Sequence, residues 1–256
     1  MPLTAHLEEL RWRLIKSLAG IGAAFLLCYQ FAEVLFAFLT EPLHSARLLV
    51  GDNPGHTVNL IGTGVVEAFF TKLKVALIAG IFLSSPITFY QLWRFVAPGL
   101  YPHEKRYALP FVLFASFFFV AGAAFCYALV LPVGYRFFLE QYGTIGVRPE
   151  LRISEYLSFT ARMLLAFGVT FELPVITFFL ARVGVVTHRT MLSYWRYAVV
   201  LIFIAAAVLT PGPDVASQLL MATPLLVLYG ASIGVAFVFA RPRPEGSTAE
   251  GTSAGS

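Results

Sequence analysis

Three acidic residues stand out in this chain because each lies inside or beside a long apolar run. Glu172 lies in AFGVTFELPV, well inside such a run, where an ionised carboxylate costs at least ~3 kcal/mol. Glu9 lies in HLEELRWRL and Glu104 in WRFVAPGLYPHEKR, where apolar sequence begins or ends. Two separated carboxylates suit a ligand with two guanidinium groups, since each accepts a charge-assisted and often bidentate bond. A carboxyl inside the apolar run suits a polar contact for a partner helix, or a proton or substrate site.

Each acid also has an ordinary structural explanation. Glu9 and Arg13 are spaced i, i+4, which is typical of an ion pair within one helix. Pro102 suits the first position of a helix, and Glu104 would then complement the helix dipole. Glu172 could be a carboxyl that is hydrogen-bonded inside a bundle. The residues alone leave both kinds of explanation open.

The composition indicates a membrane protein with several spans. Of the 256 residues, 58% are hydrophobic and only 12% are charged, and the mean hydropathy is +0.78. A soluble domain carries roughly a quarter charged residues. With 25 Phe, most of this surface is suited to lipid rather than to water.

The apolar runs predict one domain over residues 1–240 with six helical spans, followed by a disordered cytoplasmic tail over 241–256. The long first run is expected to be retained as a span rather than cleaved as a signal peptide. Pro132 is expected to end the third span, with a short interfacial helix over 133–142. The predicted spans cover about 17–39, 68–93, 107–131, 155–183, 197–210 and 218–240.

Six spans place both termini on one side of the membrane. Most of the 18 Lys and Arg residues then fall on the side of the termini, which predicts that this side is cytoplasmic. Glu9 and Glu104 share that side. The distribution accounts for the net charge of +4 without nucleic acid, so we predict no nucleic-acid partner.

Two features concern helix packing. The fifth run spans only about 20–24 Å as a helix, against a hydrocarbon thickness of ~30 Å. Either neighbouring helices shield it or the bilayer thins around it. Gly20 and Gly22 in the first run are expected to let another helix backbone approach closely.

No other chemistry is evident. Cys28 and Cys126 lie in apolar runs and are expected to be small buried hydrophobes, and the five His are scattered, so no metal site or cofactor is predicted. No nucleophile–base set lies within the spans, so we predict no enzyme. A proton-coupled secondary transporter that uses Glu172 is the alternative, although the internal repeats typical of that class are not seen.

Four motifs together resemble the TatC family, the multispanning receptor subunit of the twin-arginine protein translocase. They occur in the family's order among six spans, and the resemblance covers residues 4 to about 240. The motifs are HLEELRWRL at 6–14, FVAPGLYPHEKR at 95–106, FGVTFELPV at 167–175 and TPGPDVASQ at 210–218.

The resemblance implies an all-α polytopic membrane protein, a concave glove-like bundle of six transmembrane helices with a short fifth and sixth helix. It implies a location in the bacterial cytoplasmic (inner) membrane. TatC-like proteins bind twin-arginine signal peptides of folded precursors. They recruit single-span TatA- and TatB-like partners for export driven by the proton-motive force. Membrane lipids and further copies in the receptor complex would be additional partners.

The resemblance also implies roles for particular residues. Glu172 would line the concave face inside the fourth span. Thr210 and Gln218 would flank the docking position of a partner helix, and Pro42 and Asp214 would lie in extracytoplasmic loops. The signal-peptide surface would consist of Glu9, Leu10, Arg11, Phe95 and Glu104, with Glu9 and Glu104 facing the two arginines.

Overall fold

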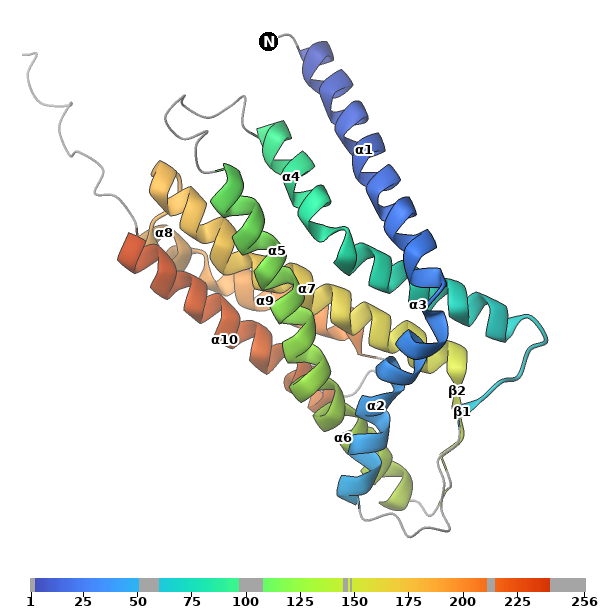
Figure 1. The fold of residues 1–256 in the computed structure, drawn as a ribbon. Helices are drawn as coiled ribbons and strands as arrows, with labels where there is room; N and C mark the ends of the chain where they lie inside the picture. The colour runs from blue at the N-terminus through green and yellow to red at the C-terminus, as the bar shows by residue number, and fades with distance from the viewer. Residues whose placement is uncertain are drawn as a thin grey trace, which may run out of the picture.

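The computed structural model describes residues 3–50, 60–96, 108–144, 147, 149–210 and 215–239, and helices dominate this part of the chain (Figure 1). The elements, in chain order, are α1 Leu3–Tyr29, α2 Ala32–Val50, β1 Leu60–Ile61, α3 Glu67–Leu83, α4 Ser85–Val96, α5 Ala108–Phe125, the π-helix η3 Cys126–Val130, α6 Leu131–Thr144, β2 Leu151–Arg152, α7 Ile153–Val183, α8 His188–Ser193, α9 Trp195–Leu209 and α10 Val215–Phe239.

Several of these helices can cross a membrane. Within the described residues, four are long and apolar enough: His6–Tyr29, Leu109–Tyr142, Ile153–Arg182 and Val215–Phe239. The pair α3 and α4 qualifies as a fifth, bent by 54°. α9 has 15 residues, as short as predicted. The prediction of a short sixth helix is wrong, because α10 has 25 residues and continues through Pro224. A proline removes one backbone bond without preventing the helix from continuing.

The helices form a central pair with groups on either side. α5 packs along α7; α1 packs on α3 and α4; and α10 packs on α7 and α9 (Figure 1). α2 and α6 lie together at one end of the molecule. The N-terminal end of α1 and the C-terminal end of α4 point toward the opposite end. This arrangement positions the two predicted ligand-binding segments on the same side.

The bend between α3 and α4 follows from one proline. Pro86 has no N–H, so it cannot bond the carbonyl of Phe82. The hydroxyl of Ser85 donates to that carbonyl instead, at 2.8 Å. Ser84 donates in the same way to the carbonyl of Ile81, at 3.2 Å. The predicted second span is therefore two helices joined at Ser84.

The helix boundaries differ from the predicted spans in two other places. α1 ends at Tyr29 and α2 begins at Ala32, so the expected first span 17–39 is interrupted and residues 40–50, expected as loop, are helical. Pro132 does not end the third span: α5 passes through η3 into α6. The N–H of Leu131 bonds the carbonyl of Cys126, five residues back, and this wider turn adapts the helix to the proline.

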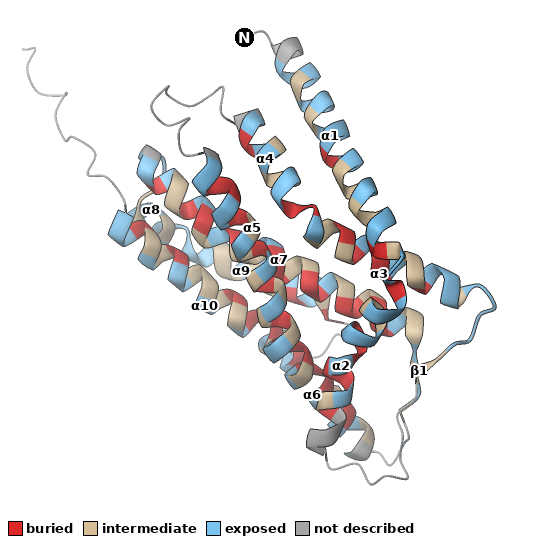
Figure 2. Cartoon of the chain, in the orientation of Figure 1, coloured by how far each residue is buried: buried red, intermediate tan, exposed pale blue. Residues whose placement is uncertain are grey.

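The larger core cluster lies where α2, η3, α6, α7 and the N-terminal half of α10 meet (Figure 2). Two glycines allow α5 and α7 to approach: a Cβ at Gly122 would lie 2.6 Å from the carbonyl oxygen of Phe167, and one at Gly168 would lie 2.8 Å from the ring of Phe119. Cys28 and Cys126 are buried, as predicted. By contrast, α1 is exposed along most of its length, as a lipid-facing helix would be.

Candidate functional site

The first candidate site is the contact between α1 and α4. The rings of His6 and Phe95 stack with their centroids 4.4 Å apart. Two turns further along α1, Arg13 Nη1 donates to Gln91 Oε1 of α4 at 3.5 Å. Side-chain contacts thus join the N-terminal motif to the start of the second motif, although about 80 residues separate them. Phe95 is half-buried in this contact.

Glu9 lies on α1 beside this contact and already holds a guanidinium group. Arg13 donates to Glu9 Oε1 from Nη2 at 2.6 Å and from Nε at 3.2 Å. The Glu9 side chain is 24% exposed and that of Arg13 is 15% exposed. The helical i, i+4 pair that the spacing predicted is therefore present. The neighbouring Leu10 and Arg11 are exposed on other faces of α1.

Two of the predicted site residues fall outside the part of the chain that the structure describes. They are Glu104, in the second motif, and Asp214, in the fourth. Their predicted roles stay predictions.

Glu172 is the second candidate site. It lies on α7 and is 6% exposed, and its Oε1 has no hydrogen-bond partner among the described residues. The hydroxyl of Ser116 on α5 is likewise buried without a partner. Gly168 of α7 contacts Phe119 of α5. Because the two helices are antiparallel, Glu172 (one turn after Gly168) and Ser116 (one turn before Phe119) lie at a similar level of the bundle. An unpaired polar group in an apolar bundle is costly, so this level of the bundle is suited to a polar partner.

Thr210 and Gln218 do lie together, at the junction of α9 and α10. Thr210 Oγ1 donates to the carbonyl of Ala206 at 3.0 Å, and Gln218 Nε2 donates to that of Phe203 at 2.9 Å. The amide of Gln218 therefore fastens α10 to α9. Thr210 is buried and Gln218 is partly buried.

Pro42 was expected in a loop but lies inside α2. Residues 32–50 remain helical because a proline inside a helix costs one bond and tilts one carbonyl without ending the helix. Its surroundings make it a packing position, since the residue is buried.

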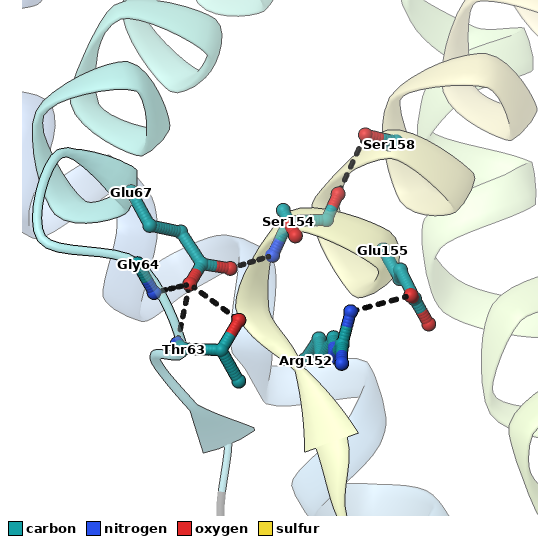
Figure 3. Close-up of polar contacts among 7 residues, drawn as sticks. All are labelled: Thr63, Gly64, Glu67, Arg152, Ser154, Glu155 and Ser158. Atoms are coloured by element: carbon teal, nitrogen blue, oxygen red, sulfur yellow. Dashed lines mark hydrogen bonds and ion pairs between the residues drawn. The ribbon is translucent and has the colours of Figure 1, made fainter.

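Glu67 is a polar centre that the sequence analysis missed (Figure 3). Its Oε2 accepts from the backbone N–H of Thr63 at 2.6 Å and of Gly64 at 3.1 Å. Its Oε1 accepts from the N–H of Ser154 at 3.0 Å, in the first turn of α7. These bonds, that from Thr63 foremost, lower the pKa of Glu67 to about 2. The Thr63-Gly64 pair shortly before Glu67 at a helix start could have predicted the local bonds to this carboxylate. Nothing in the sequence could have predicted the bond from Ser154, which is 87 residues away.

Glu67 also sits beside the two short strands. β1 and β2 pair in parallel, with Leu60 opposite Leu151 and Ile61 opposite Arg152. Glu67 therefore ties the segment before α3 to the start of α7. This pairing joins two connections that were predicted only as long loops.

Comparison with known proteins agrees with the arrangement. The chain matches the family described as Sec-independent protein translocase protein (TatC) over residues 5–224. It is 45% identical over 243 residues to the TatC protein of Desulforapulum autotrophicum, covering 94% of this chain and 86% of that relative. The TatC protein of Aquifex aeolicus is 36% identical over 246 residues, covering 96% and 98%.

A solved structure shares the fold. It is described as the crystal structure of the twin arginine translocase receptor TatC, and it superposes with a TM-score of 0.79 at 35% identity, covering 90% of this chain and 97% of that one. The fold is that of an all-helical polytopic membrane protein. The class of protein is a receptor subunit of protein transport, not an enzyme. The chain belongs to the TatC family of Sec-independent protein translocase subunits. A secondary transporter built on Glu172 is not favoured.

Proposed function

We propose that the α1–α4 contact and the segment after α4 form the surface that binds the two arginines of a twin-arginine signal peptide. The observation that supports this most strongly is the packing of His6 on Phe95, because it places the first two motifs beside each other. In this proposal Glu9 and Glu104 each accept one arginine, and Leu10, Arg11 and Phe95 contact the rest of the peptide.

The Glu9–Arg13 pair is compatible with this role. A helical i, i+4 pair contributes about 0.2–0.5 kcal/mol. A hydrogen bond to a charged group contributes about 1.5–3 kcal/mol when it is well made. An incoming arginine makes the same kind of charge-assisted bond to Glu9, so it can exchange with Arg13, and Arg13 keeps the carboxylate oriented until then.

The topology and the partners belong to the same proposal. Both termini lie in the cytoplasm, as the Lys and Arg distribution predicts, and the bundle lies in the bacterial inner membrane, as membership of the family implies. Single-span TatA- and TatB-like partners dock near Thr210, Gln218 and Glu172, and further copies of the chain and lipids complete the receptor complex. Transport is driven by the proton-motive force.

Binding of a twin-arginine signal peptide to the membrane-embedded protein tests the surface, with a two-lysine peptide as the ligand control. We expect Glu9→Ala and Glu104→Ala each to weaken binding about tenfold, the loss of one charge-assisted bond. Glu8→Ala is the matched control, because Glu8 is the adjacent, exposed acid. Equal binding by the parent, Glu9→Ala and Glu104→Ala would reject the carboxylate model.

A second variant separates a ligand site from an ordinary ion pair. Arg13→Gln removes the competitor for Glu9 without removing the carboxylate. If Glu9 binds the peptide, the affinity for the twin-arginine peptide rises slightly, by up to about twofold. If Glu9 serves only the pair with Arg13, this substitution leaves the affinity unchanged or lowers it.

A further inference from the structure

The carbonyl of Phe38 in α2 has lost its normal partner. In a helix it would accept from the N–H of residue 42, but Pro42 has no N–H and its ring pushes that carbonyl aside. The hydroxyl of Tyr127 donates to this oxygen at 2.7 Å. The rings of Phe38 and Tyr127 also stack, with centroids 4.4 Å apart and planes 6° apart.

A second tyrosine bonds the next carbonyl of the same turn. Tyr156, in the first turns of α7 and 4% exposed, donates from its hydroxyl to the carbonyl of Leu39 at 2.7 Å. Tyr135 of α6 stacks on it at 5.1 Å, and the hydroxyls of Tyr135 and Thr160 are 2.7 Å apart. The Tyr156 ring is therefore held by the stack on Tyr135 and by its hydroxyl bond to Leu39.

The π-helix η3 contributes to this geometry. Tyr127 lies within Cys126–Val130, where the backbone makes the wider turn. One extra residue in a turn rotates the side chains that follow by about 100° relative to an uninterrupted α-helix, since that helix turns 3.6 residues per revolution. The π-turn thus changes the direction in which the side chains of α6 point, and Tyr127 lies within the turn where α5 ends.

We propose that Tyr127 and Tyr156 are positioning residues that form a lock with Pro42: the proline exposes the Phe38 carbonyl, and the two hydroxyls fix that turn of α2 to η3 and α7. Lys72 Nζ also lies 2.7 Å from Glu33 Oε1, which ties the first turn of α2 to α3. α1 joins this fixed helix through Gln30 and Phe31 alone. The lock therefore fixes the helix that directly follows α1, whose own C-terminal half packs on α3 at Gly80. It does not depend on the function proposed above.

Amide hydrogen exchange of α2 in the full-length protein tests the lock. Tyr127→Phe and Tyr156→Phe keep the ring contacts and remove only the hydroxyls. We expect exchange of the amides over residues 39–46 to become about fivefold to tenfold faster, as for one lost hydrogen bond. Tyr229→Phe is the matched control: its hydroxyl also donates to a backbone carbonyl, that of Met191 at 2.9 Å, far from α2 in sequence. It should leave exchange in α2 unchanged.

A double-mutant cycle tests the part played by Pro42. Pro42→Ala restores an N–H that can bond the Phe38 carbonyl, so Tyr127→Phe should then accelerate exchange at least threefold less than it does with the proline present. An equal effect of Tyr127→Phe in both backgrounds would overturn the lock. So would unchanged α2 exchange in Tyr127→Phe and Tyr156→Phe alone.

Discussion

Glu67 and Glu172 lie in opposite environments within the same bundle, one with several hydrogen-bond donors and one in an apolar layer. Glu67 accepts backbone N–H bonds from Thr63, Gly64 and Ser154, which stabilise its charged form. Glu172 is buried in an apolar layer with one oxygen unpaired. The first carboxylate therefore serves the fold, whereas Oε1 of the second has no hydrogen-bond partner among the described residues.

The role of Glu67 predicts a pH dependence of stability. Its folded pKa of about 2 lies below the ordinary value of 4.5, so its contribution is fully present above about pH 4.5 and is lost as the pH falls toward 2. We expect Glu67→Gln to lower the melting temperature by several degrees at pH 7, and by less near pH 3. Glu155→Gln is the control, since Glu155 meets Arg152 only at 3.9 Å. A deficit in Glu67→Gln that is the same at both pH values would contradict the explanation.

For Glu172 we predict a separation of two activities. Glu172→Gln keeps the shape of the side chain and removes its ability to ionise. Crosslinking of a single-span partner to α7, or transport, should fall several-fold, while binding of the twin-arginine peptide stays within about twofold of the parent. Unchanged transport would make Glu172 a structural carboxyl.

At the scale of the elements, the pairing of α5 with α7 depends on two glycines. A Cβ at Gly122 would lie 2.6 Å from the backbone oxygen of Phe167 and 2.7 Å from Cβ of Phe171, and neither can move without shifting α7. Gly22 in α1, expected to allow close packing, has nothing within 4 Å of such a Cβ. A Cβ at Gly20, the other glycine expected there, would lie 3.1 Å from Cγ2 of Ile87 in α4, and the close approach to the backbone of α1 is made by Gly80 of α3, against Phe25.

These glycines give a paired prediction. Gly122→Ala should destabilise the detergent-solubilised protein by ~1–3 kcal/mol, the cost of overpacking. Gly22→Ala should leave stability within ~1 kcal/mol of the parent, or raise it, since alanine favours a helix. Thermal unfolding of both variants measures the difference. Equal effects would mean that α5 and α7 can separate freely.

At the scale of the whole molecule, α9 is too short for an ordinary bilayer. Its 15 residues reach about 22 Å, against ~30 Å of hydrocarbon. The described residues do not shield it: Val200, Leu201, Ile204 and Val208 are all exposed. Of the two explanations that the sequence left open, shielding by the described residues is therefore not seen, and thinning of the bilayer is the explanation that we test.

Bilayer thickness should consequently affect stability. In phosphatidylcholines of increasing chain length, the mismatch at α9 costs a fraction of a kcal/mol per Å. We expect the melting temperature of the reconstituted protein to fall as the chains lengthen. A melting temperature that rises steadily with thickness would show that α9 imposes no mismatch.

The sequence by itself determined the class of fold, the short fifth helix and the Glu9–Arg13 pair. Hydropathy and i, i+4 spacing are local properties, so they can be read without knowing which helices are neighbours. The four motifs were sufficient to predict the family. The sequence prediction failed at Pro42, which was expected in a loop, at Pro132, which was expected to end a helix, and at the sixth helix, which was expected to be short; each of these helices continues through its proline.

Only the tertiary structure decided which contacts compensate for those prolines and which acids are already occupied. Tyr127 is 89 residues from Phe38, and Ser154 is 87 from Glu67. No periodicity links such pairs, because the partner depends on how α2, α3, η3 and α7 pack. The same packing brings His6 to Phe95 and leaves Oε1 of Glu172 without a hydrogen-bond partner in the described part of the chain. The spacing of residues along the chain sets the helices, and the contacts between helices set the chemistry of each side chain.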